Sequence, residues 1–421
     1  MSQRLNRQRQ EPQHHQALQP TSAPPPRPAP DVPSSVVFHP AIIHLALAVG
    51  GFAIGITEFA TMSLLPFFAR DLHISEPVAG RAISAYALGV VVGAPLIAVL
   101  SARLARRTLL IGLMAFFALA NGLSGLAPNY HAMLVLRFLA GLPHGAYFGV
   151  AMLVAASLVP VDKRTGAVGR VLLGLTVATT VGVPLANWIG QAIGWRWAFA
   201  IVAALALLTA VLVMIFAPRD VVHAEASPLR ELSALRRKHV WLTLAIGAIG
   251  FGGLFSVYTY LASTMLAVTQ VSPALVPVAL CVFGIGLTAG NIIVPRFADR
   301  ALMATAGGLL LWSAAALALY PLAAGNFWTL IIDVLLIGLG GALATVLQTR
   351  LMDVAGEAQT LAAALNHSAF NTANALGPWL GGMAIAAGYG WTSTGLVGAG
   401  LALAGFAIWA VAAVLAKREG V

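Results

Sequence analysis

About twelve segments of this chain are long and apolar enough to cross a membrane as helices. Hydrophobic residues make up 59% of the sequence and charged residues only 9%, whereas a soluble domain carries nearer a quarter charged residues. The segments are too long and too rich in Leu and Ala for barrel strands, which predicts an all-α membrane protein. We expect the spans near 41–63, 78–100, 107–126, 131–159, 165–191, 196–217, 240–268, 274–297, 302–323, 327–351, 358–387 and 391–415.

Lysine and arginine are distributed unevenly around these spans. If the N-terminus lies inside, 20 of the 24 basic residues fall in the tails and loops of that side, 3 fall on the other side, and Arg137 lies within a span. Cytoplasmic loops carry such an excess. The net charge of +10 therefore indicates topology rather than nucleic-acid binding. It predicts a multi-pass protein of a bacterial-type inner membrane, with both termini cytoplasmic.

The sequence predicts two halves of about six spans each. Residues 1–40 are rich in Gln and Pro, a composition that forms no packed core, so we expect a disordered cytoplasmic tail there. The longest internal loop separates two apolar regions and is expected to be a cytoplasmic linker. The expected parts are the tail 1–40, an N-terminal six-helix bundle 41–217, the linker 218–239 and a C-terminal six-helix bundle 240–416.

Short patterns recur between these halves. Gly141 and Gly338 are separated by 197 residues, and Gly194-Trp195 recurs as Gly390-Trp391 at an offset of 196. Repeated halves with loops in the same places are typical of transporters built from parallel repeats. The recurrence therefore predicts two pseudo-symmetric bundles.

Three charged side chains lie well inside the spans, namely Glu58, Arg137 and Asp333. A charge at the bilayer centre costs roughly 2.5–3.5 kcal/mol on insertion scales. At 1.5 Å per residue, all three are expected about 10 Å below the outer surface. Intramembrane ionisable groups are functional by default, although a static ion pair that locks helix packing explains Glu58 and Arg137 as well.

Two motifs resemble those of proton-coupled drug antiporters in the major facilitator superfamily. Residues 137–145, Arg-Phe-Leu-Ala-Gly-Leu-Pro-His-Gly, resemble the fourth-helix motif and include Arg137, Gly141 and Pro143. A looser match to the fifth-helix glycine-proline motif includes Gly182 and Pro184.

Further segments, 53–59, 85–95 and 194–197, look closest to the arabinose-efflux-like branch of that superfamily. The resemblance extends over about 41–415 and implies the major facilitator fold. It also implies that the first, fourth, seventh and tenth helices line a central cavity.

The cytoplasmic loop motif of the family is altered in its first copy. Ala102 stands where the family usually has Asp, next to a basic group, whereas the second copy keeps the acidic residue. The resemblance implies a latch between the halves that is weaker here, although the arginines also act as topology determinants. The motif residues are Arg103, Arg106 and Arg107 in the first copy and Asp299 and Arg300 in the second.

The resemblance gives the buried charges expected roles. A carboxyl group beside an arginine stays ionised, whereas one alone in a low-dielectric cavity takes up a proton. We expect Glu58 to be the main proton carrier, Arg137 its charge partner, and Asp333 a second titratable or substrate-binding group.

Polar residues in other spans are candidates for lining the cavity. His367, Asn371 and Asn374 share one helix face, because they follow i, i+4, i+7 spacing. Tyr258 and Tyr260 are two residues apart and cannot lie on the same face of their helix, so only one of them is a good candidate. Hydrogen bonding between helices, or close packing, explains these residues equally well. The candidates are His144, Tyr258, Asn291, His367, Asn371 and Asn374, with Pro378 as a point where a helix flexes.

The sequence favours a proton-coupled secondary transporter that exports small molecules, either sugars or drugs, by alternating access. The alternatives are a proton symporter or facilitator for uptake, and a non-transporting membrane sensor. No phosphate-binding Gly-x-x-x-x-Gly-Lys-Ser/Thr motif, metal-ligand spacing or Ser nucleophile motif supports an enzyme. The expected partners are a small-molecule substrate, protons and the lipid bilayer, with no cofactor, metal or nucleic acid, and the protein is expected to be a monomer.

Overall fold

The computed structural model describes residues 40–101, 104–160, 164–218, 236–355 and 359–419. Contacts between Cα atoms divide the chain into residues 1–37 and residues 38–421, and all the described helices belong to the second unit. The predicted tail and most of the predicted linker therefore lie outside the described residues. Within the described ranges all regular structure is helical, as the sequence predicts.

The helices before the predicted linker are called the first half. They are α1 (Pro40–Ser63), α2 (Leu65–Asp71), α3 (Glu76–Leu100), α4 (Arg106–Gly125), α5 (Tyr130–Ser157), α6 (Arg164–Val177), η2 (Ala178–Gly182), α7 (Val183–Ile193) and α8 (Trp195–Phe216).

The helices after it are called the second half. They are α10 (Lys238–Gly250), α11 (Gly252–Ala267), η4 (Pro273–Leu275), α12 (Val276–Ile293), α13 (Pro295–Ala298), α14 (Leu302–Ala323), α15 (Phe327–Gly340), α16 (Leu343–Ala355), α17 (Gln359–Ala384), η5 (Ile385–Tyr389) and α18 (Ser393–Glu419).

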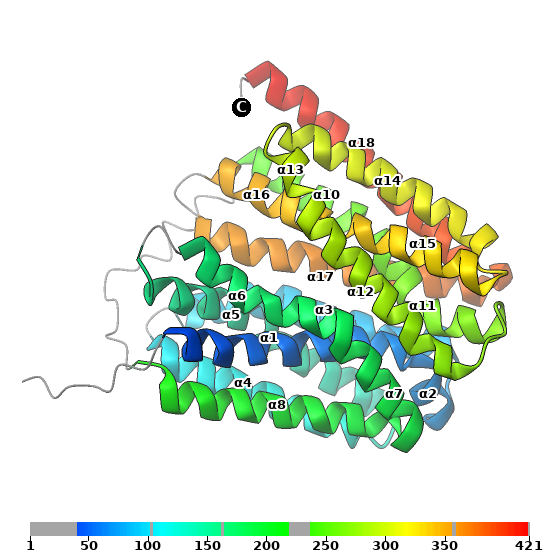
Figure 1. Ribbon diagram of the computed structural model, residues 1–421, viewed down its shortest axis with the longest axis horizontal. Coiled ribbons are helices and arrows are strands. Elements are labelled where there is room, and N and C mark those ends of the chain that lie inside the picture. Colours follow the sequence, from blue (N-terminus) through cyan, green and yellow to red (C-terminus); the bar gives the residue numbers. More distant parts are fainter. Residues whose placement is uncertain (1–39, 102–103, 161–163, 219–235, 356–358, 420–421) are drawn as a thin grey trace, which may run out of the picture. The chain divides into compact units, whose positions relative to one another are not determined.

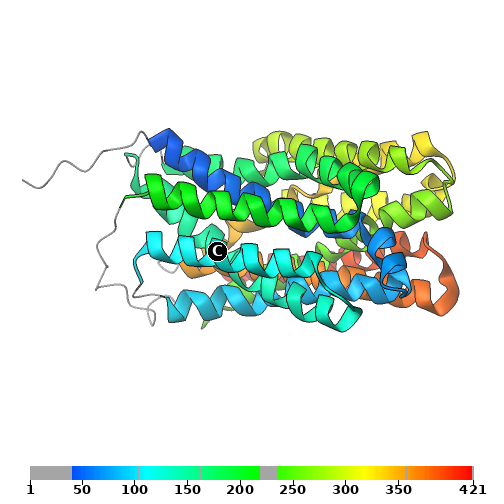
Figure 2. The same ribbon diagram turned by 90° about the horizontal axis from the view of Figure 1, so that it is seen from below.

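Within residues 38–421 the long helices run side by side, as Figure 1 shows. Helix α3 packs against α5 in its own half and against α17 in the other, and α1 also contacts α11. Figure 2 shows the blue α1 alongside the green α8, a pair that packs closely. The end at which α1 begins and α18 finishes is called the terminal face, and the other end the opposite face.

Eleven helical segments among the described residues are long and apolar enough to cross a membrane. The segment expected at 358–387 does form a helix, α17, but it is not one of the eleven. Its buried side chains include Asn366, Asn371 and Asn374, and amide groups lower the hydropathy of the helix. An intramembrane helix of this polarity must satisfy its amides against neighbouring helices.

Glycines allow α3 and α5 to cross with their backbones in contact. A Cβ atom at Gly141 would overlap the backbone oxygen of Tyr86, and one at Gly89 would overlap that of Phe138. Small residues at such crossings are typical of helix pairs in membranes. This close approach brings Tyr86 of α3 under the side chain of Arg137 on α5.

We expect Gly141→Ala to lower the thermal stability of the purified protein, because the added methyl group must push α5 away from α3. Overpacking of this kind costs about 1–3 kcal/mol. Gly149→Ala is the matched control on the same helix, because a Cβ there meets no atom within 4 Å. Thermal unfolding in detergent, followed by fluorescence, measures both. Equal melting temperatures for the two variants would contradict the close crossing.

Candidate functional site

Glu58 links the two halves. It lies on α1, is 7% exposed, and accepts a hydrogen bond at 3.1 Å from Nδ2 of Asn374 on α17. Every residue of α1 from Ala53 to Ser63 is buried, because this part of the helix is covered by both halves. Asn374 is buried as well, and its own carbonyl oxygen has no hydrogen-bond partner among the described residues. The Glu58 carboxyl group is therefore hydrogen-bonded to a neutral amide of the other half.

Arg137 is held by neutral groups of the first half. It is 1% exposed, and Nη1 donates hydrogen bonds of 3.1 Å to Oγ1 of Thr57 and to Oδ1 of Asn121. Its guanidinium also lies 4.2 Å from the centre of the Tyr86 ring and 5.5 Å from that of Phe199. Cation–π contacts of a desolvated arginine contribute about 2 kcal/mol. Arg137 thus joins α5 to α1, α3, α4 and α8.

Glu58 and Arg137 do not form an ion pair within 4.0 Å in the part of the chain that the structure describes. Thr57, next to Glu58 in the sequence, binds Arg137, while Glu58 turns towards α17. The predicted pairing of these two charges is therefore indirect in this arrangement, and its role in coupling stays a prediction.

Asp333 is buried on α15 at 3% exposure. Neither of its carboxyl oxygens has a hydrogen-bond partner among the described residues, and the same is true of the Tyr320 hydroxyl on α14. Both side chains are buried within the second half. No hydrogen bond connects Asp333 to Glu58 or Arg137 among the described residues.

His144 and His367 meet between the halves. Nδ1 of His144 is hydrogen-bonded to the Tyr86 hydroxyl at 3.0 Å, and the rings of His144 and His367 have centroids 6.1 Å apart. His367 stacks on Phe148, with ring centroids 5.3 Å apart and planes 4° from parallel. On α17, Asn371 donates a hydrogen bond to the His367 carbonyl. The predicted polar face of α17 thus lies against the first half at two levels.

Tyr258 contacts the first half through its ring. It packs edge-on against Phe59 of α1 at 5.5 Å, lies tilted against Phe283 at 4.4 Å, and its hydroxyl has no hydrogen-bond partner among the described residues. Tyr260 donates a hydrogen bond to the carbonyl of Pro378, and its ring and hydroxyl lie against Gly80 of α3. Both tyrosines thus reach the first half, and which of them lines a cavity stays a prediction.

Asn291 lies away from this group. Its Oδ1 accepts a hydrogen bond of 2.7 Å from Thr345, which joins α12 to α16 within the second half.

The loop-motif residues are only partly described. Ala102 and Arg103 lie outside the described residues. Arg106 begins α4, and Arg107 donates a hydrogen bond to the backbone oxygen of Met214 at the end of α8. Asp299 and Arg300 follow α13. Because part of the first copy lies outside the described residues, the latch stays a prediction.

The glycine-proline motif coincides with an irregularity in the fifth span. Residues Ala178–Gly182 form a π-helical turn before Pro184. A Cβ at Gly182 would overlap side chains of Ile56 and Phe52 on α1. Irregular turns of this kind occur often at functional sites, and this one packs against both α1 and α12 of the other half.

The hydrogen bonds that join the two halves lie towards the opposite face. At 1.5 Å per residue, the deepest of them is about 20 Å from that face. The pairs are Glu76 with Ser263, Gln191 with the Pro273 carbonyl, Ser84 with the Ala375 carbonyl, Asn374 with Glu58, and Thr180 with Thr288. The described residues show no such bond nearer the terminal face.

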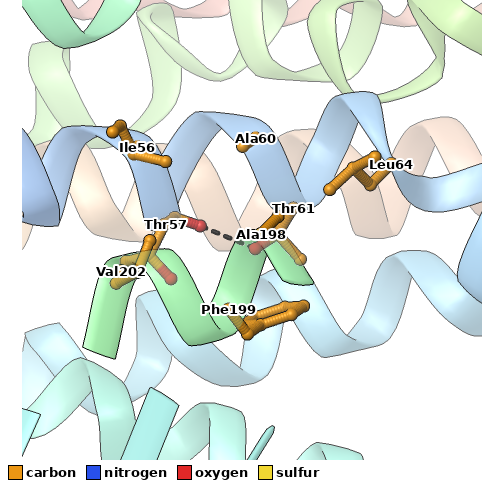
Figure 3. A pocket seen from close by; sticks show the side chains of 8 residues that line it. All are labelled: Ile56, Thr57, Ala60, Thr61, Leu64, Ala198, Phe199 and Val202. Carbon is orange, nitrogen blue, oxygen red and sulfur yellow. Dashed lines mark hydrogen bonds between the residues drawn. The ribbon is translucent and has the colours of Figure 1, made fainter. Parts of the chain in front are cut away.

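A small hollow lies beside Thr57, between α1 and α8 (Figure 3). Apolar side chains dominate its lining, with Ile56, Leu64, Phe199 and Val202 around Thr57 and Thr61. Its cavity volume is about 10 Å³, far below the roughly 300 Å³ of small-molecule sites. It contains neither Glu58 nor Asn374, so we do not regard it as the substrate site.

Comparison with known proteins agrees with this architecture. The model of the Major Facilitator Superfamily matches residues 47–322. The inner membrane transport protein YdhP of Escherichia coli K12 is 41% identical over 363 residues, which cover 85% of this chain and 93% of that protein. A chloramphenicol resistance protein of Streptomyces lividans is 36% identical, over 79% of this chain and 86% of that protein.

Two further likenesses concern the branch and the fold. The putative transporter AraJ of Escherichia coli K12 is 30% identical over 86% of this chain and 92% of that protein, which is consistent with the arabinose-efflux-like branch. A crystal structure of a bacterial homologue of the human lysosomal transporter Spinster, inward-facing and unoccupied, superposes with a TM-score of 0.67 at 17% identity, over 89% of this chain and 96% of that one. These relatives are membrane transporters, not enzymes.

Proposed function

The chain belongs to the major facilitator superfamily of multi-pass membrane transporters, and we propose that it is a proton-driven exporter of small molecules. A relative in Helicobacter pylori that is named a probable sugar efflux transporter, 27% identical over 80% of this chain, supports the direction. In this proposal a proton enters from outside as substrate leaves the cell.

The observation on which the proposal rests is the bond between Glu58 and Asn374. Alternating access requires the two halves to move apart around a central site. Among the described residues, the one hydrogen-bond partner of the Glu58 carboxyl group is a neutral amide of the other half, and this partner is lost when the halves separate. The environment of the Glu58 carboxyl group then changes with the conformation, and its proton affinity changes with it. Glu58 is in this way the proton carrier.

Arg137 sets the electrostatic potential at Glu58. It donates a hydrogen bond to Thr57, the residue before Glu58, and has no carboxylate partner among the described residues. An unneutralised cation near the central carboxyl group favours release of its proton. Asp333 is a second titratable or substrate-binding group, supported by its two unpartnered oxygens.

The positions of the hydrogen bonds between the halves support a transporter closed at the opposite face, because they lie towards that face. The excess of basic residues at the terminal face supports a cytoplasmic position for it. In this orientation the closed barrier separates Glu58 from the outside, and the proton of Glu58 is to be released towards the cytoplasm.

The surroundings of Glu58 favour uncharged or singly cationic substrates with an apolar ring. Phe59, Phe255 and Tyr258 form a chain of aromatic contacts beside it. The unpartnered oxygens of Asn371 and Asn374 add hydrogen-bond acceptors. Such a site binds a ring with a donor group better than a polyanion. Both small drugs and sugars belong to this class.

Everted membrane vesicles with an imposed pH gradient test the proposal. Chloramphenicol and L-arabinose serve as probes, and a pH-sensitive dye reports proton movement. We expect at least one probe to accumulate with release of protons from the vesicle lumen. Proton movement in the same direction as the probe would instead show a symporter for uptake, and movement of neither probe would contradict the proposal.

A further inference from the structure

Titratable side chains are arranged in steps between Glu58 and the terminal face. We propose that Tyr86, His144 and His367 form the path by which the proton of Glu58 reaches the cytoplasmic side. The proposal rests on the export function proposed above and adds to it a route that the coupling charges alone do not provide.

The depths of these groups form a series. Measured from the helix ends at the opposite face at 1.5 Å per residue, Glu58 of α1 lies about 8 Å deep and its hydrogen-bond partner Asn374 of α17 about 15 Å deep, level with Tyr86. His144 follows at about 21 Å and His367 at about 26 Å. Four helices contribute one group each: α1, α3, α5 and α17. The series ends at His367, about 12 Å from the start of α17 at the terminal face.

Tyr86 is placed to take part in both ends of the first step. Its side chain is 1% exposed, its hydroxyl is hydrogen-bonded to Nδ1 of His144 at 3.0 Å, and the arginine above its ring, Arg137, is hydrogen-bonded to Thr57, the residue before Glu58. The guanidinium of Arg137 covers its ring at 4.2 Å. The Tyr86 hydroxyl is therefore fixed against Nδ1 of His144, to which it can pass its proton.

The two histidines carry the path across the boundary between the halves. His144 is 2% exposed, whereas His367 is half-buried. Their ring centroids are 6.1 Å apart and no hydrogen bond joins them among the described residues, so the transfer passes through a water molecule between the rings. Phe148 stacks on His367 and fixes its plane. The path therefore ends at a partly exposed imidazole, the side chain best suited to exchange protons near neutral pH.

Few other charged groups act on these rings. The titratable side chains that face His144 are Tyr86 from α3 and His367 from α17. The helices packed against α17 carry charges towards both faces. Near the opposite face these are Glu76 and Arg81 of α3, deeper in the bundle Arg137 of α5, and near the terminal face Lys238 and His239 of α10, Arg350 and Asp353 of α16, and Lys417, Arg418 and Glu419 of α18.

The transfer balances as a single proton moved without electrons. The O–H bond of the Glu58 carboxyl group breaks, and the proton passes, through water if needed, to the oxygen of Tyr86. Tyr86 gives its own proton to Nδ1 of His144, which forms an imidazolium. The Nε2–H bond of that ring then breaks as His367 takes up a proton and delivers one to cytoplasmic water. Glu58 is left ionised and Tyr86 returns to its starting form, whereas His144 is left as its Nδ1–H tautomer and regains the Nε2–H tautomer by exchanging one proton for another with water before the next cycle.

The test compares two transport modes in everted vesicles, with chloramphenicol and L-arabinose as probes. The variant His144→Asn with His367→Asn keeps hydrogen-bonding amides but carries no proton. We expect proton-driven accumulation to fall about 100-fold, the lower limit for a positioned proton-transfer group, while exchange of probe at equal pH stays within about twofold of wild type. Tyr86→Phe, which keeps the ring under Arg137, is expected to slow the driven mode alone and to change its pH profile.

His131→Gln is the matched control, because His131 is an exposed histidine on the same helix as His144. Driven transport by the double variant equal to that of this control overturns the path. So does an equal loss of both modes, which would make the histidines substrate ligands. Loss of coupling in Glu58→Gln together with normal coupling in the histidine variants overturns the path alone. Retained coupling in Glu58→Gln, or no driven movement of either probe in the wild type, overturns the export function with it.

Discussion

Glu58→Gln is expected to abolish proton-driven transport and to leave exchange of substrate at equal pH intact. Glutamine has the size of the protonated carboxyl group, and its amide oxygen can accept the hydrogen bond from Asn374 that Glu58 accepts at 3.1 Å. The contact between α1 and α17 therefore survives. What is lost is the ability to release and rebind a proton at the boundary between the halves.

The two modes are measured in everted vesicles as the initial rate of accumulation under a pH gradient and the rate of counterflow without one. We expect the driven rate to fall by about 100-fold or more, the scale of an essential proton-transfer group. Counterflow is expected to stay near wild type, because the protonated Glu58 side chain and the glutamine that replaces it present the same acceptor to α17.

Asp71→Asn is the control carboxyl variant. Asp71 lies outside the spans at the opposite face, and the Arg196 guanidinium beside it holds the pKa of that carboxyl below its usual range. An exposed pair of this kind is worth about 0–1 kcal/mol, so both transport modes should be kept. Coupled transport by Glu58→Gln at the rate of this control would show that Glu58 carries no proton.

The sequence predicts the fold because the repeat reflects real helix crossings. Gly141 approaches the backbone oxygen of Tyr86, and Gly338 approaches that of Phe283. The two glycines are 197 residues apart, and Tyr86 and Phe283 are separated by the same number. The same contact therefore recurs in α3 with α5 and in α12 with α15. In this register Arg137 corresponds to Val334, so Asp333 is offset by one residue, about 100° around the helix.

The partners of the buried charges are what the sequence does not predict. Burial of Glu58 and Arg137 follows from the cost of a charge in the membrane. Their hydrogen bonds depend on which helices pack together, and Asn374 is 316 residues from Glu58. The isolated Asn121 in an otherwise apolar span was a usable signal, since such an amide must find a partner. Nothing in the sequence connects it to Arg137.

Arg137→Met is expected to abolish driven transport without lowering thermal stability. Burying a guanidinium carries a desolvation penalty that a methionine side chain does not, and Arg137 has no carboxylate partner within 4.0 Å among the described residues, so its removal leaves no buried charge unpaired. The groups around Arg137 tolerate the change, because Thr57 already donates a 2.6 Å hydrogen bond to Asn121. The methionine side chain fills the space against Tyr86 and Phe199.

A purely structural arginine predicts the opposite result. If Arg137 serves only to lock α5 against α1 and α4, removal of its hydrogen bonds should lower the melting temperature in detergent, and driven transport and counterflow should fall together. If it sets the field at Glu58, the melting temperature stays or rises while the driven mode alone is lost. Arg196→Met, at an exposed arginine paired with Asp71, controls for the loss of a positive charge. The pair of measurements thus decides between a static lock and a coupling charge.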